Sequence, residues 1–268
     1  MPETDDLDLL IRAAREAGKI ATRVAGKDAQ RWDKPDGAGP VTEADLAVNA
    51  MLEGMLPAAR PGYGWLSEET EDNADRLDRS RVFIIDPIDG TRSFAEGSRT
   101  WAHSLAVATD GIVTAAAIYL PQRDLLYTAA AGKGAYLNGE PIRISGCDDL
   151  TNADILAAKP NTFAHHWRSG TCPGFNRSYR PSLAYRLAAV AQGRFDGMLT
   201  LRPSWEWDIA AGDLLLREAG GACTDRTGAP LRFNNAHPKV NGVVATNAAL
   251  HQQFLDALDP TGPGIAPD

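Results

Sequence analysis

Cysteine and long apolar runs are scarce in this sequence. Its three cysteines, Cys147, Cys172 and Cys223, are odd in number and widely spaced, which excludes a cysteine-based zinc or redox motif and is typical of a reducing cytoplasm. The longest apolar stretches, such as 105–108 and 112–119, have the length of strands rather than of membrane-spanning helices. The first residues are acidic and do not resemble a basic signal peptide. We therefore expect a soluble cytoplasmic protein that is not attached to a membrane.

Positive charge is also in short supply. The chain has 27 Lys and Arg against 35 Asp and Glu, and this formal net charge of −8 argues against general nucleic-acid binding, although basic patches can exist locally. Internal repeats and low-complexity segments are absent. With 268 residues, the chain can bury about three quarters of the surface that it exposes when unfolded. It can form one large domain or two units that share a cleft.

Hydrophobic periodicity predicts a mixed α/β chain in two halves, residues 1–148 and 149–268. The turn dipeptides Asp110-Gly111 and Asn138-Gly139 separate β-prone runs in the first half, which predicts an antiparallel meander. The expected helices span 9–24, 182–192, 208–221 and 248–258, with another that starts after residue 42. The expected strands span 82–85, 104–109, 112–120, 125–130, 135–137, 155–158 and 195–199.

The segment 82–91 begins with an apolar run typical of a buried strand and continues with two carboxylates and a turn. Pro87 cannot donate to a strand ladder, so it predicts the end of the strand, and the aspartate-glycine pair that begins at Asp89 is a strong turn signal. Asp86 and Asp89 are hard oxygen donors, close enough together to share cations. An isolated segment of this kind is more often an acidic surface turn, so the interpretation depends on partners elsewhere.

Two other acidic motifs supply such partners. Glu68 and Glu69 follow a short strand-like stretch at 64–66, and Asp208 precedes an apolar segment, where we expect it to be the first residue of a helix. Clustered carboxylates repel one another unless cations neutralise them, so this set predicts a metal site. The simpler alternatives are surface acids and, for Asp208, a plain helix cap.

These motifs together resemble the inositol monophosphatase family, the lithium-sensitive, magnesium-dependent phosphatases. The similarity spans nearly the whole chain and rests on the segment 86–91, on the two glutamates, on residues 41–45, and on Trp207-Asp208 with the small residues at 210–212 and the segment 218–221. It implies a layered αβαβα sandwich of the type found in inositol monophosphatase and fructose-1,6-bisphosphatase. It also implies two or three Mg²⁺ ions, a small phosphorylated substrate and a possible homodimer.

The same resemblance implies a ligand set for the metals. Glu68, Asp86 and the carbonyl group of Ile88 would hold the first cation. Asp86, Asp89 and Asp208 would hold the second, and Glu68 with waters the weakest third. Phosphate monoester cleavage needs positioning and charge neutralisation more than covalent work, which suits such a site.

The same resemblance implies catalytic roles for Asp45, Glu69 and Thr91. Asp45 would hold the hydroxyl group of Thr91 so that the pair orients and deprotonates a water, although Thr42 and Asp45 also have the spacing of a capping box. If a helix starts after the turn, the amides of Gly90 and Thr91 would bind the phosphate. Lys34, in a Gly/Pro-rich loop, is either a phosphate ligand or an exposed lysine.

The substrate is predicted from one missing residue and one unusual segment. Inositol phosphatases place a glutamate several residues before the Trp-Asp motif, whereas this chain has Thr200 or Leu201 there. Its segment 202–208 instead resembles that of some bacterial 3′(2′),5′-bisphosphate nucleotidases. We expect adenosine 3′,5′-bisphosphate as substrate, with Ser182 in contact with it and Trp205 as a platform for the base or, alternatively, as a packing residue.

A second phosphate on the substrate would need a cation. The candidates are Arg177, Arg180, Arg186 and Lys159. An inositol, histidinol or sugar phosphatase remains an alternative, as does a non-catalytic regulatory protein on the same scaffold. No serine-histidine-aspartate set is evident, and His165 and His166 lie in a polar loop where we expect solvated side chains. His103, His237 and His251 have no predicted role.

Overall fold

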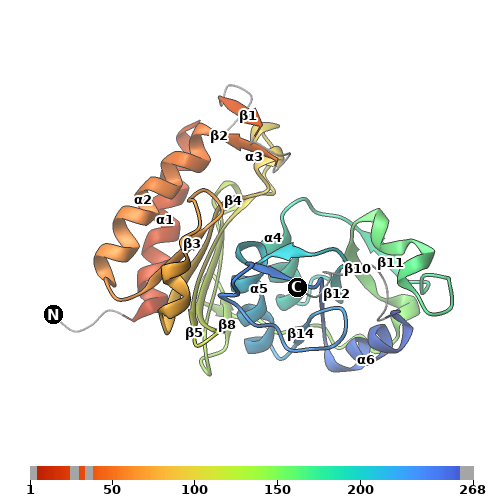
Figure 1. The fold of residues 1–268 in the computed structure, drawn as a ribbon. Coiled ribbons are helices and arrows are strands. Elements are labelled where there is room, and N and C mark those ends of the chain that lie inside the picture. The colour runs from red at the N-terminus through yellow and green to blue at the C-terminus, as the bar shows by residue number, and fades with distance from the viewer. Residues whose placement is uncertain (1–4, 25–29, 34–38, 260–268) are drawn as a thin grey trace.

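Two large β-sheets alternate with layers of helices in the computed structural model, which describes residues 5–24, 30–33 and 39–259 (Figure 1). The helices are α1 (Asp6–Val24), α2 (Glu43–Ala59), α3 (Thr91–Ala95), α4 (Leu183–Ala191), α5 (Glu206–Glu218) and α6 (Ala248–Ala257). The seven-stranded sheet contains, in spatial order, β3 (Gly64–Ser67), β4 (Arg81–Asp89), β5 (Ala102–Thr109), β6 (Ile112–Leu120), β7 (Leu125–Ala130), β8 (Ala135–Leu137) and β9 (Glu140–Pro141).

The five-stranded sheet belongs to the second half of the chain. Its spatial order is β11 (Asn176–Ser178), β10 (Asp154–Ala157), β12 (Gly197–Thr200), β16 (Val243–Thr246) and β14 (Ala222–Thr224). Two-stranded ladders join β1 (Arg31–Asp33) to β2 (Pro40–Thr42) and β13 (Ser204–Trp205) to β15 (Lys239–Val240). Single 3₁₀ turns link several elements, among them Ala74–Asp78 between β3 and β4.

The alternation of side chains along the strands explains the layers. On β4, Phe83 and Ile85 pack with α1 and α2, whereas Val82 and Ile84 face the cluster that contains α4 and α5. Burial of each such side chain stabilises the fold by about 1.5–3 kcal/mol. The five-stranded sheet shares its inner face with α4 and α5 and packs its outer face against α6. The resulting order, helices, sheet, helices, sheet, helix, confirms the predicted αβαβα sandwich.

Helices α4 and α5 approach closely in the middle layer because α5 carries a glycine at the crossing. A Cβ atom at Gly212 would lie 2.4 Å from the Cβ atom of Leu187 on α4, a distance that packed atoms do not adopt. The small residues that follow Trp207-Asp208 are therefore a packing requirement. Their close packing against α4 fixes the position of the first turn of α5.

Most of the predicted elements are confirmed, and β5 to β8 form the expected antiparallel meander, which β4 and β9 extend at its two edges. Several boundaries differ, two of them next to the aspartates. β4 continues past Pro87 to Asp89, because the ladder skips the proline and resumes where Asp89 pairs with Ala102. The helix expected from Asp208 begins two residues earlier, at Glu206, after the extended residue Trp205.

The division into halves at residues 148 and 149 stays a prediction. No helix in the described ranges combines the length and the apolar character needed to cross a membrane.

Candidate active site

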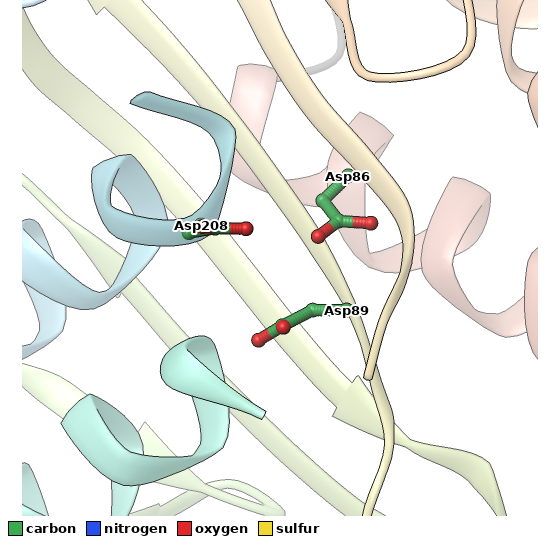
Figure 2. A group of neighbouring side chains, drawn as sticks. All are labelled: Asp86, Asp89 and Asp208. Carbon is green, nitrogen blue, oxygen red and sulfur yellow. The ribbon is translucent and has the colours of Figure 1, made fainter. Parts of the chain in front are cut away.

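Three aspartates from distant parts of the chain converge at the end of β4 and the start of α5 (Figure 2). One carboxylate oxygen from each of Asp86, Asp89 and Asp208 lies within 4.8 Å of the other two. Residues three apart on a regular strand point to opposite faces, so the irregular step at Pro87 and Ile88 is what lets Asp86 and Asp89 share one side.

Asp86 is the clearest sign that this cluster is built for a cation. Its side chain is 1% exposed, and neither carboxylate oxygen has a hydrogen-bond partner. Burial, together with the charges of Glu68, Asp89 and Asp208, raises the pKa of Asp86 well above its usual value. Buried polar atoms are rarely left unsatisfied, and carboxylate oxygens are the ligands that Mg²⁺ and Ca²⁺ prefer.

Asp89 is held in place by the N-terminus of α4. The hydroxyl group of Ser182 and the backbone amide of Ala184 both donate to its Oδ2 atom, each at 2.6 Å. Burial nevertheless raises the pKa of Asp89 to about 6. Ser182 is itself fully buried and also caps α4 by accepting a hydrogen bond from the Tyr185 amide. Its packing argues against the prediction that Ser182 touches substrate, because its hydroxyl group positions Asp89.

Glu68 is brought near the cluster by the pairing of β3 with β4, and Glu69 is the next residue of the chain. These strands run parallel, and the amide of Glu68 donates to the carbonyl oxygen of Ile85, one residue before Asp86. The charge of Glu68 contributes to the raised pKa values of Asp86 and Asp208. Both Glu68 and Glu69 are half-buried. The parallel strands thus bring together acids that are far apart in the sequence.

Thr91 and Asp45 lie in hydrogen-bond contact beside the cluster. The Thr91 hydroxyl group is 3.1 Å from Oδ1 of Asp45 and 3.1 Å from the carbonyl oxygen of Ile88. Oδ2 of Asp45 accepts hydrogen bonds from the amide and the hydroxyl group of Thr42 at the start of α2. Asp45 therefore contacts Thr91 through Oδ1 and takes part in the capping box of α2 through Oδ2, so both alternatives for this residue are present. Burial raises its pKa to about 6.

The turn before α3 needs a glycine. Gly90 has φ of 97°, in the left-handed region, and α3 begins at the next residue. This sharp reversal places Thr91 next to Ile88 and Asp89. The expected helix start at this point is therefore present.

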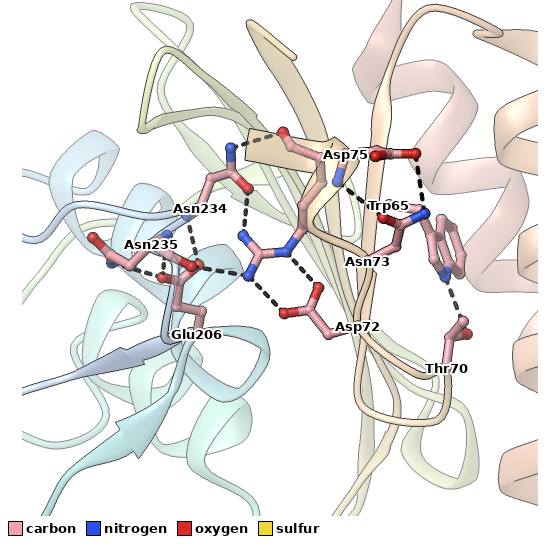
Figure 3. A network of polar contacts seen from close by, with 9 residues as sticks. Trp65, Thr70, Asp72, Asn73, Asp75, Glu206, Asn234 and Asn235 are labelled. Atoms are coloured by element: carbon pink, nitrogen blue, oxygen red, sulfur yellow. Dashed lines mark hydrogen bonds and ion pairs between the residues drawn. The ribbon is translucent and has the colours of Figure 1, made fainter. Parts of the chain in front are cut away.

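A buried polar network fixes the start of α5 (Figure 3). Glu206, the first residue of α5, is fully buried and accepts hydrogen bonds from the amides of Asn234 and Asn235. Arg76 binds the side chain of Asn234 and the carbonyl oxygen of Asn235, and forms a two-point ion pair with Asp72. The network ties the first half of the chain to the helix that carries Asp208. The sequence had no signal for it.

A cavity of about 580 Å³ opens beside the aspartates. Asp89, Gly90 and Asp208 line one part of it. The rest is formed by loops, 3₁₀ turns, α4 and the end of β12, and includes Asn161, His166, Tyr179, Arg186, Thr200 and Arg202. The cavity has the size of sites that bind drug-sized ligands. Most of these residues carry no motif, so sequence patterns could not find them.

Trp205 does not line this cavity. Its ring stacks on Trp207, with centroids 4.6 Å apart and an angle of 11° between the planes, and Nζ of Lys239 lies 3.9 Å from its centroid. An ammonium group cannot fit between two stacked rings, so it covers the opposite face. The ring leaves no open face for a base, and this argues against the predicted base stacking. Lys34 lies outside the described residues.

The histidines are less solvated than the sequence suggests. His165 is exposed, but His166 is buried against the cavity, and burial lowers its pKa to about 4, so it is neutral at pH 7. His103 is also buried, with Nδ1 in contact with the carbonyl oxygen of Pro87 in the irregular step of β4. A polar neighbourhood in the sequence was a poor guide to burial here.

The chain is similar in sequence and in structure to known proteins. The profile of the inositol monophosphatase family matches residues 4–261. Inositol-1-monophosphatase of Mesorhizobium japonicum is 33% identical, over 94% of this chain and 95% of that protein, and Nus factor SuhB of Escherichia coli K12 is 36% identical, over 94% and 98%. The solved inositol monophosphatase of Thermotoga maritima is 28% identical, with a TM-score of 0.80 over 94% of this chain and 96% of that chain. The chain belongs to the inositol monophosphatase family of phosphatases.

Proposed function

We propose that this protein is a magnesium-dependent phosphomonoesterase that removes the 3′-phosphate of adenosine 3′,5′-bisphosphate, yielding adenosine 5′-monophosphate and phosphate. The observation that carries the metal dependence is Asp86, whose two buried carboxylate oxygens have no hydrogen-bond partner beside Asp89 and Asp208. Isolated carboxylates in such a place would take up protons, whereas a cation keeps them ionised. The family is also one of metal-dependent phosphatases.

The proposed ligand set is the one that the family resemblance implies. Glu68, Asp86 and the Ile88 carbonyl group hold one Mg²⁺, Asp86, Asp89 and Asp208 a second, and Glu68 contributes to a weaker third. Bound Mg²⁺ supplies positive charge that neutralises the phosphate oxygens and makes a water more acidic. Two buried hydrogen-bond donors, from Ser182 and Ala184, keep the Asp89 side chain in one orientation.

The protein's own groups complete the reaction. Thr91, aligned by Asp45 and the Ile88 carbonyl oxygen, orients the attacking water and passes its proton toward Asp45. Glu69 assists in the same role. The amides at Gly90 and Thr91 bind the phosphate where the chain turns into α3.

The choice of substrate rests on the cavity. The lining contains no carboxylate at residues 200–202, where sugar hydroxyl groups would need an acceptor, and it contains two arginines, Arg186 and Arg202. Both features favour an anionic leaving group. Inositol 1-phosphate is the second candidate, because relatives such as the one from Mesorhizobium japonicum are named inositol-1-monophosphatase. Histidinol and sugar phosphates, and a regulatory role without catalysis, have less support. A cytoplasmic location and a homodimer remain proposals.

A substrate panel tests this assignment. We expect the purified protein with Mg²⁺ to hydrolyse adenosine 3′,5′-bisphosphate with a kcat/KM at least about tenfold above that for inositol 1-phosphate, histidinol phosphate and fructose 1,6-bisphosphate. Such a factor needs only about 1.4 kcal/mol of differential transition-state binding. Faster turnover of inositol 1-phosphate would overturn the nucleotidase assignment. Full turnover in excess chelator would overturn the metal dependence.

A further inference from the structure

Arg186 is a buried cation that makes no direct ion pair in the part of the chain that the structure describes, although the charges of Asp89 and Asp208 act on it from a longer distance. Its side chain lies on α4 and the residue is only 5% exposed. Nε donates to the carbonyl oxygen of Arg180, and Nη2 is 3.5 Å from that of Pro181. Within the described ranges, no carboxylate lies in ion-pair distance of the guanidinium group, and Nη1 has no hydrogen bond. A charge so placed is costly unless something of the opposite sign offsets it.

A second cation faces the same cavity. Arg202 lines it together with Arg186. Burial lowers the pKa of Arg186 and the charge of Arg202 acts in the same direction, whereas Tyr179, Asp89 and Asp208 oppose this shift. The ring of Tyr179 lies 4.5 Å from the Arg186 guanidinium carbon and holds that group on one side of the cavity. Two arginines converging on a space of ligand size make a site for an anion.

The two arginines and the aspartate cluster line the same cavity. Asp89, Gly90 and Asp208 line the part where a phosphate would be hydrolysed, whereas Arg186 lies on α4 and Arg202 lies in the loop between β12 and β13. The cavity volume of about 580 Å³ leaves room beyond a single phosphate. A substrate with two anionic groups would place one at the Mg²⁺ ions proposed for the aspartate cluster and the other at the two arginines.

We infer that Arg186 and Arg202 bind a second phosphate or carboxylate group on the leaving part of the substrate, so that the enzyme selects substrates with two anionic groups. The inference rests on the proposed phosphatase activity and deepens it. A guanidinium group suits the role because its planar donors match a phosphate or carboxylate in two-point contact. The other candidates fit less well, because Arg177, Arg180 and Lys159 do not line the cavity.

A matched pair of substrates isolates the second anion. Adenosine 3′,5′-bisphosphate and adenosine 3′-monophosphate share the scissile phosphate and differ in the 5′-phosphate alone. We expect Arg186→Gln to lower kcat/KM for the bisphosphate by at least about tenfold, mainly through KM, and to change that for the monophosphate by less than about threefold. Arg202→Gln should act in the same direction, and Arg186→Lys should restore part of the loss. Arg177→Gln, an exposed arginine outside the cavity, is the control.

The outcomes separate the inference from the proposed function. Equal losses for both substrates in Arg186→Gln and Arg202→Gln would overturn the inference and place Arg186 at the hydrolysed phosphate. Absence of Mg²⁺-dependent turnover of any substrate would overturn the proposed function instead. If no turnover is found, a binding experiment tests the anion site by itself. Adenosine 5′-monophosphate should then raise the melting temperature of the native chain, and adenosine should not. If Arg186→Gln does not fold, the exposed Arg202 provides the test, and an unchanged substrate preference in Arg202→Gln would count against the inference.

Discussion

Replacement of Asp89 by asparagine should make the metal-free protein more stable and the enzyme nearly inactive. The change removes one charge and keeps the shape of the side chain, and the asparagine oxygen can still accept the hydrogen bonds from Ser182 and Ala184. Burial raises the pKa of Asp89 from 3.8 to about 6 in the folded chain. This difference of about two pKa units corresponds to about 3 kcal/mol, the cost of keeping this carboxylate ionised when no cation is present.

The sign of the pH dependence follows from proton binding. Between pH 3.8 and 6 the folded chain holds a proton on Asp89 that the unfolded chain has lost, so stability falls as the pH rises through this range. Asp89→Asn removes this pH-dependent contribution to the free energy of unfolding. In chelator we expect the variant to be more stable than the native chain by up to about 3 kcal/mol at pH 7.5, and by almost nothing near pH 4.

Urea unfolding in chelator at the two pH values measures the effect, which amounts to a midpoint shift of about 1 M for an m value of about 3 kcal/mol/M. Added Mg²⁺ should stabilise the native chain more than the variant, and the variant should lose at least about 100-fold in kcat. Asp154→Asn, at an exposed aspartate of β10, is the control. A variant that unfolds at the same or lower urea concentration at pH 7.5 would refute the reasoning.

Four other changes probe the site. Thr91→Ala should lower kcat by orders of magnitude at saturating Mg²⁺ because the contact with Asp45 is lost, and near-native turnover would show that the pair does not orient the water. Arg76→Gln should raise the Mg²⁺ concentration needed for half-maximal rate, because the network no longer fixes the helix of Asp208; an unchanged Mg²⁺ dependence would contradict this. Lithium should inhibit, since it is similar in size to Mg²⁺ but carries half the charge, and full activity in excess lithium would argue otherwise. Trp205→Ala should lower the melting temperature and affect all substrates alike, because the ring packs on Trp207; a selective loss of nucleotide turnover would restore the base-stacking hypothesis.

Local patterns in the sequence determined many of the elements of the fold and which aspartates gather at the end of β4. Turn dipeptides and alternating apolar residues mark the strands of the meander because turn geometry and strand periodicity are local properties. The acidic motifs predicted which carboxylates gather, since strand ends and helix starts converge in the αβαβα sandwich. The family resemblance depended on these same short segments.

Tertiary structure alone decided what each side chain near the cluster touches. The irregular step at Pro87 turns Asp86 and Asp89 to one side, although strand periodicity by itself would separate them. Ser182 and Trp205 looked like substrate contacts, but one positions Asp89 and the other is covered on both faces of its ring. Arg186 was one of four candidate cations in the sequence, and only the packing of α4 buries it beside the cavity. Sequence fixes residue type and spacing, whereas burial and the direction of a side chain depend on how distant elements pack against each other.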